Sequence, residues 1–180
     1  MTRKRLDRRV FLRNLGVSTL ALGSAKVAYA RAPAKRSLSF EHTHTGESLS
    51  VVYFEEGAYQ VASLERINHL LRDFRTEEVH PIDPRTLDIL FDLQTLADRD
   101  APFQVISGYR SPQTNATLRG RSSGVAEHSL HMQGRAIDVR LGGFSTGRLH
   151  DLARQMGRGG VGFYPRSDFV HLDSGPVRFW

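Results

Sequence analysis

Short runs of apolar residues predict six β-strands along the chain. Each run either alternates apolar and polar side chains, as a strand with one buried face does, or is apolar throughout. The runs cover residues 38–44, 48–54, 103–106, 136–141, 160–164 and 169–172. Thr45-Gly46-Glu47 lies between the first two runs and predicts the turn of a β-hairpin.

Longer segments predict helices, because their apolar residues recur every three or four positions. The helices are expected over residues 64–74, 84–97 and 146–156, with one or two further turns over residues 113–119. Ser63, Asp83 and Ser145 precede the three longer segments and are their expected N-caps. Helices and strands mix without a regular βαβ alternation, so the predicted fold class is α+β.

Residues 1–30 have the pattern of an export signal. Basic residues come first, followed by an apolar stretch over residues 15–25 and by the small-x-small cleavage site Ala28-Tyr29-Ala30. The stretch is too short to span a bilayer, so no transmembrane anchor is expected in the mature chain. Arg8-Arg9-Val10-Phe11-Leu12-Arg13 resembles the twin-arginine motif, with Asp7 where Ser or Thr is usual. The small-x-small site predicts cleavage after Ala30, and the resemblance implies the twin-arginine export machinery as a partner and a periplasmic or secreted bacterial protein.

The basic charge of the chain is concentrated in that segment. The 180 residues include 25 Lys+Arg and 19 Asp+Glu, a net charge of +6 that by itself suggests nucleic acid or an anionic surface. Residues 1–30 hold seven of the basic residues and one of the acidic residues, so 18 of each remain beyond them. Nucleic acid is therefore not an expected partner. A basic nucleic-acid-binding arm would also need neither the apolar stretch nor the cleavage site.

The rest of the chain is expected to form a flexible lead-in, residues 31–37, and one domain, residues 38–180. This length is sufficient to bury a single hydrophobic core. The sequence contains no cysteine, which excludes disulfides, a cysteine nucleophile and cysteine-bound zinc. Any metal site must therefore be built from histidine and carboxylate side chains.

Suitable side chains lie in and beside the predicted strand at residues 136–141. Gly134, Ala136 and Asp138 share one face of an extended segment, and the two small residues leave room around the carboxylate. His131 lies seven residues before Asp138, a separation of roughly 23 Å in an extended chain. The chain must fold back for the two to share a metal, and Gly134 is the natural position for the bend.

The last predicted strand supplies a second set of polar residues. His171 and Asp173 share one of its faces, and Asp168 lies just before it. His131, Asp138 and His171 could supply three ligands to one zinc ion, with a fourth position left for water as in catalytic zinc sites. A carboxylate must then accept the proton of that water, and Asp168 is the candidate. Asp173 could orient His171 or replace Asp168 as the base.

The same residues carry a resemblance to a known family. Ser129-x-His131-x-x-Gly134-x-Ala136-x-Asp138, followed by Asp168-x-x-His171, resembles the signature of the D-alanyl-D-alanine zinc peptidases, a superfamily that includes the hedgehog fold. Residues 107–111 are similar to a third motif of that superfamily. The hairpin around Thr45-Gly46-Glu47 and residues 169–180 resemble its YcbK-like branch of murein endopeptidases.

The resemblance implies a fold and a set of roles. The fold would be a small antiparallel sheet with flanking helices. His131, Asp138 and His171 would bind one zinc ion per chain, and Asp168 would act as the base, although many members have Glu there. Arg110 would contact a carbonyl or carboxylate of the substrate. Ser107, Ser129 and Asp173 would support the ligands or contact the substrate, whereas Glu127 and His128 are interpreted as loop residues.

The activity implied by the resemblance is hydrolysis of an amide bond in peptidoglycan peptide cross-links by a zinc-dependent endopeptidase. Three alternatives remain. The same site could belong to a D,D- or L,D-carboxypeptidase that acts on peptide stems. A zinc-containing murein-binding protein could keep the fold without the chemistry. A metal-free periplasmic domain could use the histidines structurally.

Overall fold

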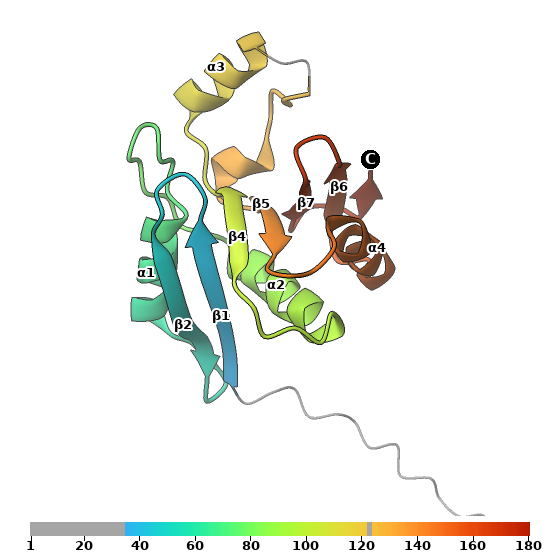
Figure 1. The fold of residues 1–180 in the computed structure, drawn as a ribbon. Coiled ribbons are helices and arrows are strands. Elements are labelled where there is room, and N and C mark those ends of the chain that lie inside the picture. The colour runs from blue at the N-terminus through green and yellow to red at the C-terminus, as the bar shows by residue number, and fades with distance from the viewer. Residues whose placement is uncertain (1–34, 122–123) are drawn as a thin grey trace, which may run out of the picture. The chain divides into compact units, whose positions relative to one another are not determined.

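A computed structural model describes residues 35–121 and 124–180 of the protein (Figure 1). The expected export signal and the first part of the expected lead-in lie outside these residues. Within the described ranges, no helix combines the length and the apolar character that a membrane span requires.

The described residues form one mixed sheet of eight strands, in the order β3-β2-β1-β4-β5-β7-β6-β8. The pairs β1–β4 and β6–β8 are parallel, and the other neighbouring strands are antiparallel. The α+β class is confirmed, while the sheet is larger than expected and is mixed. The strands are β1 (Lys35–His42), β2 (Ser48–Glu55), β3 (Ala58–Tyr59), β4 (Phe103–Ser107), β5 (Ala136–Leu141), β6 (Gly160–Tyr164), β7 (Phe169–Asp173) and β8 (Arg178–Phe179).

Helices pack along the sheet and extend beyond one of its ends. Among them, α1 packs on β2, α2 packs on β1 and α4 packs on β6 and β7. Figure 1 shows α3 beyond the end of β4, with the short 3₁₀ helix η1 between α3 and the sheet. The helices are α1 (Val61–Leu70), α2 (Pro84–Leu96), α3 (Pro112–Arg121), η1 (Leu130–Gln133) and α4 (Thr146–Met156).

The predicted hairpin is present, but β1 begins at Lys35, so residues 35–37 belong to the sheet and not to a lead-in. Arg36 explains the difference. Its Nη1 donates to Asp88 Oδ1 at 2.6 Å, and its guanidinium lies 4.6 Å from the ring centre of Phe54. These contacts hold Arg36 in β1. Its polar side chain adds nothing to the apolar pattern from which the strand was predicted.

The first helix differs from its prediction at both ends. It begins after Gln60, so Ser63 is inside α1 and is not its N-cap. It ends at Leu70 rather than at Phe74, because a turn follows in which Asp73 Oδ1 accepts from the backbone N–H of Arg75 at 3.1 Å. The same turn holds the loop that carries Arg110, because Asp73 Oδ2 accepts from the N–H of Ser111.

The N-cap predicted for α2 is confirmed, since Asp83 accepts a hydrogen bond from the N–H of Arg85 at 3.0 Å. Ser145 occupies the N-cap position of α4, although its side chain makes no capping hydrogen bond. The helix α3 is longer than the one or two expected turns.

The core fixes which face of β5 is available for a site. Ile137, Val139 and Leu141 are almost fully buried in the cluster that includes Leu87 and Leu90 of α2. Burial of a side chain of this size contributes about 1.5–3 kcal/mol to folding. Successive side chains of a strand alternate between faces, so this packing turns Asp138 to the opposite face.

Candidate metal centre and substrate pocket

Four neighbouring strands place a row of residues on one face of the sheet. Ser107 of β4 pairs with Asp138 of β5, Asp138 pairs with His171 of β7, and His171 pairs with Gly162 of β6. Side chains of directly paired residues point to the same face. The register therefore brings Asp138 and His171 together, as a shared metal ion would require.

The third residue, His131, reaches the row from η1. Ser129 precedes η1 as its N-cap, and its Oγ accepts from the N–H of His131 at 3.3 Å. Gly134 ends η1 with a left-handed φ of 63°, which confirms the predicted bend. A Cβ at this position would lie 2.1 Å from the carbonyl oxygen of Pro81, so both space and conformation require glycine.

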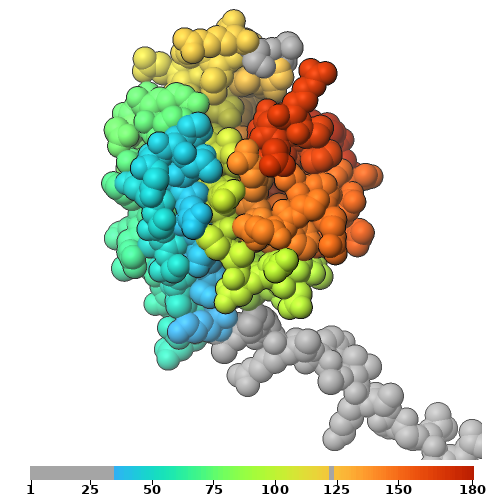
Figure 2. Space-filling view, viewed as in Figure 1, coloured from blue at the N-terminus to red at the C-terminus, as the bar shows by residue number. Residues whose placement is uncertain are grey.

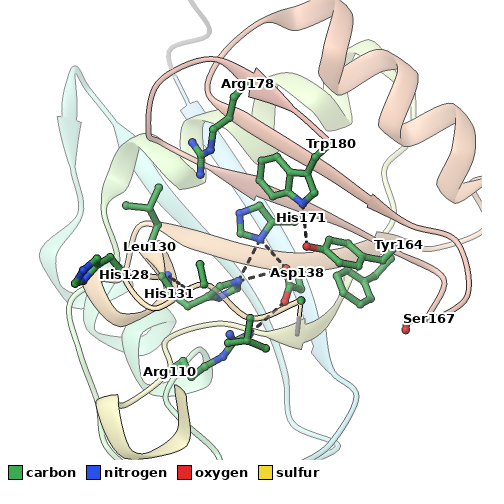
Figure 3. Close-up of a pocket in the computed structure, with 15 residues that line it drawn as sticks. Arg110, His128, Leu130, His131, Asp138, Tyr164, Ser167, His171, Arg178 and Trp180 are labelled. Carbon is green, nitrogen blue, oxygen red and sulfur yellow. Dashed lines mark hydrogen bonds and ion pairs between the residues drawn. The ribbon is translucent and has the colours of Figure 1, made fainter. Parts of the chain in front are cut away.

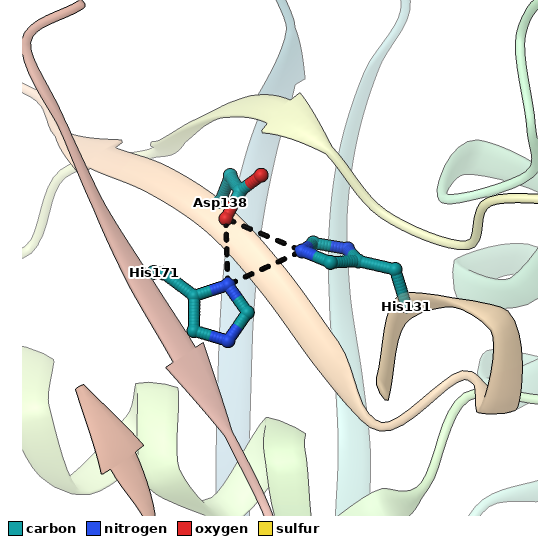
Figure 4. Close-up of side chains that lie close together, drawn as sticks. All are labelled: His131, Asp138 and His171. Carbon is teal, nitrogen blue, oxygen red and sulfur yellow. Dashed lines mark hydrogen bonds and ion pairs between the residues drawn. The ribbon is translucent and has the colours of Figure 1, made fainter. Parts of the chain in front are cut away.

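His131, Asp138 and His171 converge through one atom each (Figure 4). Asp138 Oδ1 lies 2.9 Å from His171 Nδ1 and 3.3 Å from His131 Nε2. The two ring nitrogens are 3.2 Å apart. Ligand atoms of a tetrahedral zinc ion lie about 3.3–3.6 Å from one another, because each is at 2.0–2.2 Å from the metal. The three atoms therefore fit one face of such a site with only a small outward adjustment.

The ring nitrogens that point away from this triangle are also held. His131 Nδ1 lies 2.8 Å from the carbonyl oxygen of Gly108, and His171 Nε2 lies 2.9 Å from Asp173 Oδ2. Such contacts fix the orientation of metal-binding histidines and leave the other nitrogen for the ion. The chemistry of the donor set and its orientation thus both fit a divalent cation.

The charged forms of Asp138 and His171 stabilise each other. Burial disfavours the charged form of Asp138, but the adjacent histidines outweigh it and hold the pKa of this carboxyl well below its usual range. Burial also disfavours the imidazolium of His171, but hydrogen bonds with Asp138 and Asp173 raise its pKa to about 9. Burial lowers the pKa of His131. A cation bound at the three atoms would replace the proton of His171.

Arg110 lies beside the triangle. Its Nη2 is 3.6 Å from Asp138 Oδ2 and 3.4 Å from Ser107 Oγ, and its backbone N–H donates to the carbonyl of His131 at 3.2 Å. Burial lowers the pKa of the guanidinium. Its Nε is buried and has no hydrogen-bond partner among the described residues.

The three converging residues and Arg110 open into a pocket of about 530 Å³ (Figure 3). The described residues that line it come from the segment before η1, from η1 itself, and from the β6–β7 and C-terminal segments. Figure 2 shows α3 (yellow) and the β6–β7 loop (red) at the same end of the molecule. The lining residues are Arg110, Gly124, Val125, Ala126, His128, Ser129, Leu130, His131, Asp138, Tyr164, Ser167, Phe169, His171, Arg178 and Trp180.

The structure does not bring Asp168 to the pocket. Its side chain is 66% exposed, its Oδ1 accepts a hydrogen bond from the hydroxyl of Thr146, and its Oδ2 is 3.4 Å from Arg140 Nε. Its backbone is left-handed, with a φ of 51°. In these positions the carboxylate anchors the β6–β7 loop to α4 and β5.

Asp173, unlike Asp168, contacts a residue of the converging triangle, His171, and its side chain is fully buried. Its Oδ2 accepts from His171, and Arg178 Nη2 donates to the same oxygen at 2.8 Å. These contacts correspond to the first of its two expected roles, that of orienting His171.

Sequence reasoning missed two aromatic residues that line the pocket. Trp180 Nε1 donates to the hydroxyl of Tyr164 at 2.9 Å, and the Trp180 ring centre is 5.2 Å from that of His171. Tyr164 is the last residue of a predicted strand and Trp180 lies beyond the last predicted strand, and nothing in the strand pattern identifies either as part of the site. The resemblance of residues 169–180 to murein endopeptidases was the one available signal.

Comparison with known proteins assigns the chain to a family. A family model described as "Peptidoglycan L,D-endopeptidase MepK" matches residues 30–180. The chain belongs to this family. The peptidoglycan L,D-endopeptidase MepK of Escherichia coli (strain K12) is 42% identical over 171 residues, which cover 92% of this chain and 94% of that protein. The probable peptidoglycan L,D-endopeptidase MepK of Haemophilus influenzae is 41% identical over 167 residues, covering 92% and 89%.

Membership of the MepK family confirms the resemblance to murein endopeptidases that the motifs indicated. The family match contains every residue of the pocket and of the converging triangle. The candidate metal site and the pocket therefore lie wholly within the part of the chain that belongs to this family.

Proposed function

We propose that the protein is a zinc-dependent endopeptidase that hydrolyses an amide bond in peptidoglycan peptide cross-links. The observation that carries this proposal is the convergence of His131, Asp138 and His171 at the pocket. A zinc ion held there would polarise the scissile carbonyl and lower the pKa of a bound water. The relatives are named L,D-endopeptidases, which supports a bond between an L- and a D-configured centre.

Arg110 would bind the oxygen of the scissile carbonyl. Its guanidinium is held by Ser107 and Asn115, and its backbone N–H is held by the carbonyl of His131. A donor that is already in place stabilises the charge that develops on the oxygen without reorganisation. Ser129 would contribute indirectly, because it caps the turn that holds His131.

Asp168 remains our candidate for accepting the proton of the attacking water. Among the described residues that line the pocket, Asp138 is the only carboxylate, and it faces the two histidines. Asp168 would reach the pocket only after its contacts with Thr146 and Arg140 open. A movement of the β6–β7 loop would therefore accompany this role.

We also propose export through the twin-arginine pathway and cleavage after Ala30. The basic and apolar pattern of residues 1–30 and the presence of the substrate outside the cytoplasm support this location. If the pathway is used, replacement of both Arg8 and Arg9 by Lys keeps the protein in the cytoplasm. Unchanged export of that variant would contradict the pathway assignment.

Digestion of defined cross-linked muropeptides, followed by mass analysis of the products, tests the activity. Zinc-loaded protein is expected to separate the two stems of a cross-link, and chelation is expected to abolish the reaction. Release of only a terminal residue from an uncross-linked stem would favour the carboxypeptidase alternative. Binding of murein without any product, with zinc present, would favour the binding protein.

A further inference from the structure

Trp180 is fixed along one side and open on the other. Its backbone N–H donates to Val161 at 3.2 Å and its carbonyl accepts from Phe163 at 3.0 Å, which extends the pairing of β8 with β6. Its Nε1 donates to Tyr164, yet 49% of the residue remains exposed. An aromatic residue that is held in place and left open at a pocket is a typical binding surface.

The register of the sheet places this ring directly beside the metal ligands. Gly162 is the neighbour of His171 in the row that also contains Asp138 and Ser107. The indole occupies the space above Gly162, because a Cβ there would lie 2.6 Å from Trp180 Cε2. Trp180 thus extends the row of site residues by one position, and Figure 3 shows its ring next to His171 and Tyr164.

The hydroxyl group of Tyr164 can still donate a hydrogen bond in this arrangement. Its hydroxyl oxygen accepts from Trp180 Nε1, so its own proton is left for another acceptor. Its ring stacks on Phe169 with 4.6 Å between the ring centres, which limits its movement. Both rings line the pocket together with His171.

We propose that Trp180 and Tyr164 form a substrate subsite beside the metal centre. The open face of the indole packs against the aliphatic part of a stem residue next to the scissile amide. The Tyr164 hydroxyl donates a hydrogen bond to a carbonyl of the same stem. This subsite rests on the proposed endopeptidase function and determines which stem is accepted.

Steady-state kinetics on a defined cross-linked muropeptide tests the subsite. Trp180→Ala is expected to raise KM about tenfold or more, with kcat changed less than about threefold, since the lost contact exists before the reaction as well as during it. Tyr164→Phe is expected to raise KM about threefold, as befits one neutral hydrogen bond. An unchanged KM for Trp180→Ala would overturn the proposal.

Phe179→Ala is the matched control. Phe179 is 44% exposed and directly precedes Trp180, but it does not line the pocket, and Arg154 lies over its ring at 5.2 Å. Its KM is expected to stay at the wild-type value. Trp180→Phe keeps an aromatic ring over Gly162, so it separates loss of the contact from loss of folding. A KM increase in Phe179→Ala as large as that in Trp180→Ala would mean a general effect of the C-terminal segment.

Fluorescence gives a readout that does not depend on turnover. Trp180 is the single tryptophan of the sequence, so the emission under tryptophan-selective excitation reports on this ring alone. Adding the muropeptide to chelator-treated protein is expected to shift the emission in a saturable manner. Unchanged emission together with an unchanged KM in Trp180→Ala would contradict the subsite but not the proposed endopeptidase activity. Wild-type protein that is inactive with zinc would instead remove the proposed function itself.

Discussion

His171 illustrates how single residues divide the work of the site. Its Nδ1 faces Asp138, while its Nε2 is held by Asp173, which also accepts from Arg178 and from the N–H of Gly175. Burial favours the protonated form of Asp173, but the hydrogen bonds outweigh it and lower its pKa to about 2. A charged, fully hydrogen-bonded carboxylate is thus available to orient the ring.

Replacing Asp173 by Asn is expected to weaken zinc binding by about 10- to 100-fold, the usual effect of removing the partner of a metal-bound histidine. The measurement is a zinc competition titration against a chromogenic chelator. Asp168→Asn is the control, because it removes a nearby carboxylate that does not contact a ligand. Equal zinc affinity in Asp173→Asn and wild type would show that His171 is oriented without this contact.

Asp168 needs a separate test of its role in the reaction. If Asp168 is the base, kcat of Asp168→Asn is expected to fall by about 10²–10⁴-fold, the contribution typical of a general base. A fall of less than about tenfold would mean that the carboxylate stays with Thr146 and Arg140 during turnover and is not the base. Single-turnover kinetics with saturating zinc distinguishes the two outcomes.

The three residues that converge at the candidate metal site could be predicted from the sequence, whereas the rest of the pocket could not. Small residues at 134 and 136 mark the face of Asp138, and the two strand patterns identify Asp138 and His171 separately. The position of Trp180 depends on β8, which has only two residues and pairs with β6 in parallel. A strand that short has no periodicity, so its register appears only in the folded sheet.

At the scale of elements, the strongest patterns were the most informative. The strand β5 has the predicted limits, and Asp83 caps α2 as expected. The helix η1 gave no signal, because one 3₁₀ turn is too short for an apolar periodicity. The helix α3 is mostly polar, so its length could not be predicted from apolar spacing.

Asp73 connects the end of α1 to the loop that carries Arg110. Its side chain is 1% exposed, and its Oδ2 accepts from the N–H of Ser111 at 2.9 Å. Burial alone would raise the pKa of Asp73, but hydrogen bonds from Thr114 and Ser111 lower it below the usual value. The stabilisation from this carboxylate is therefore present above the unfolded-state pKa and is lost as pH falls through the folded-state pKa.

Asp73→Asn is accordingly expected to lower the free energy of unfolding by about 1–3 kcal/mol at pH 7, the cost of a lost hydrogen bond to a buried charge. The difference in free energy of unfolding between the variant and wild type should become smaller below about pH 4, where aspartate in the unfolded chain becomes protonated. Urea unfolding at pH 7 and pH 3 measures both values. Glu65→Gln, at an exposed position of α1, should show no such difference, and a gap that is constant with pH would contradict the account.

At the scale of the whole molecule, the site joins segments that are distant in sequence. His131 comes from η1, Asp138 from β5 and His171 from β7, so a shared metal ion would cross-link these elements. Two of these elements, β5 and β7, pack through Ile137 and Leu172 into the core on the other face. Metal binding should therefore be coupled to the stability of the folded domain.

This coupling predicts a metal-dependent melting temperature. Zinc at about 100 times its Kd should add about 2.7 kcal/mol to the free energy of unfolding. For a domain of this size that corresponds to a rise in Tm of about 5–10 °C. Differential scanning calorimetry with zinc and with chelator measures the shift. His131→Ala should melt at the same temperature with zinc and with chelator. A wild-type Tm that does not change with zinc would mean that the three side chains do not bind the ion.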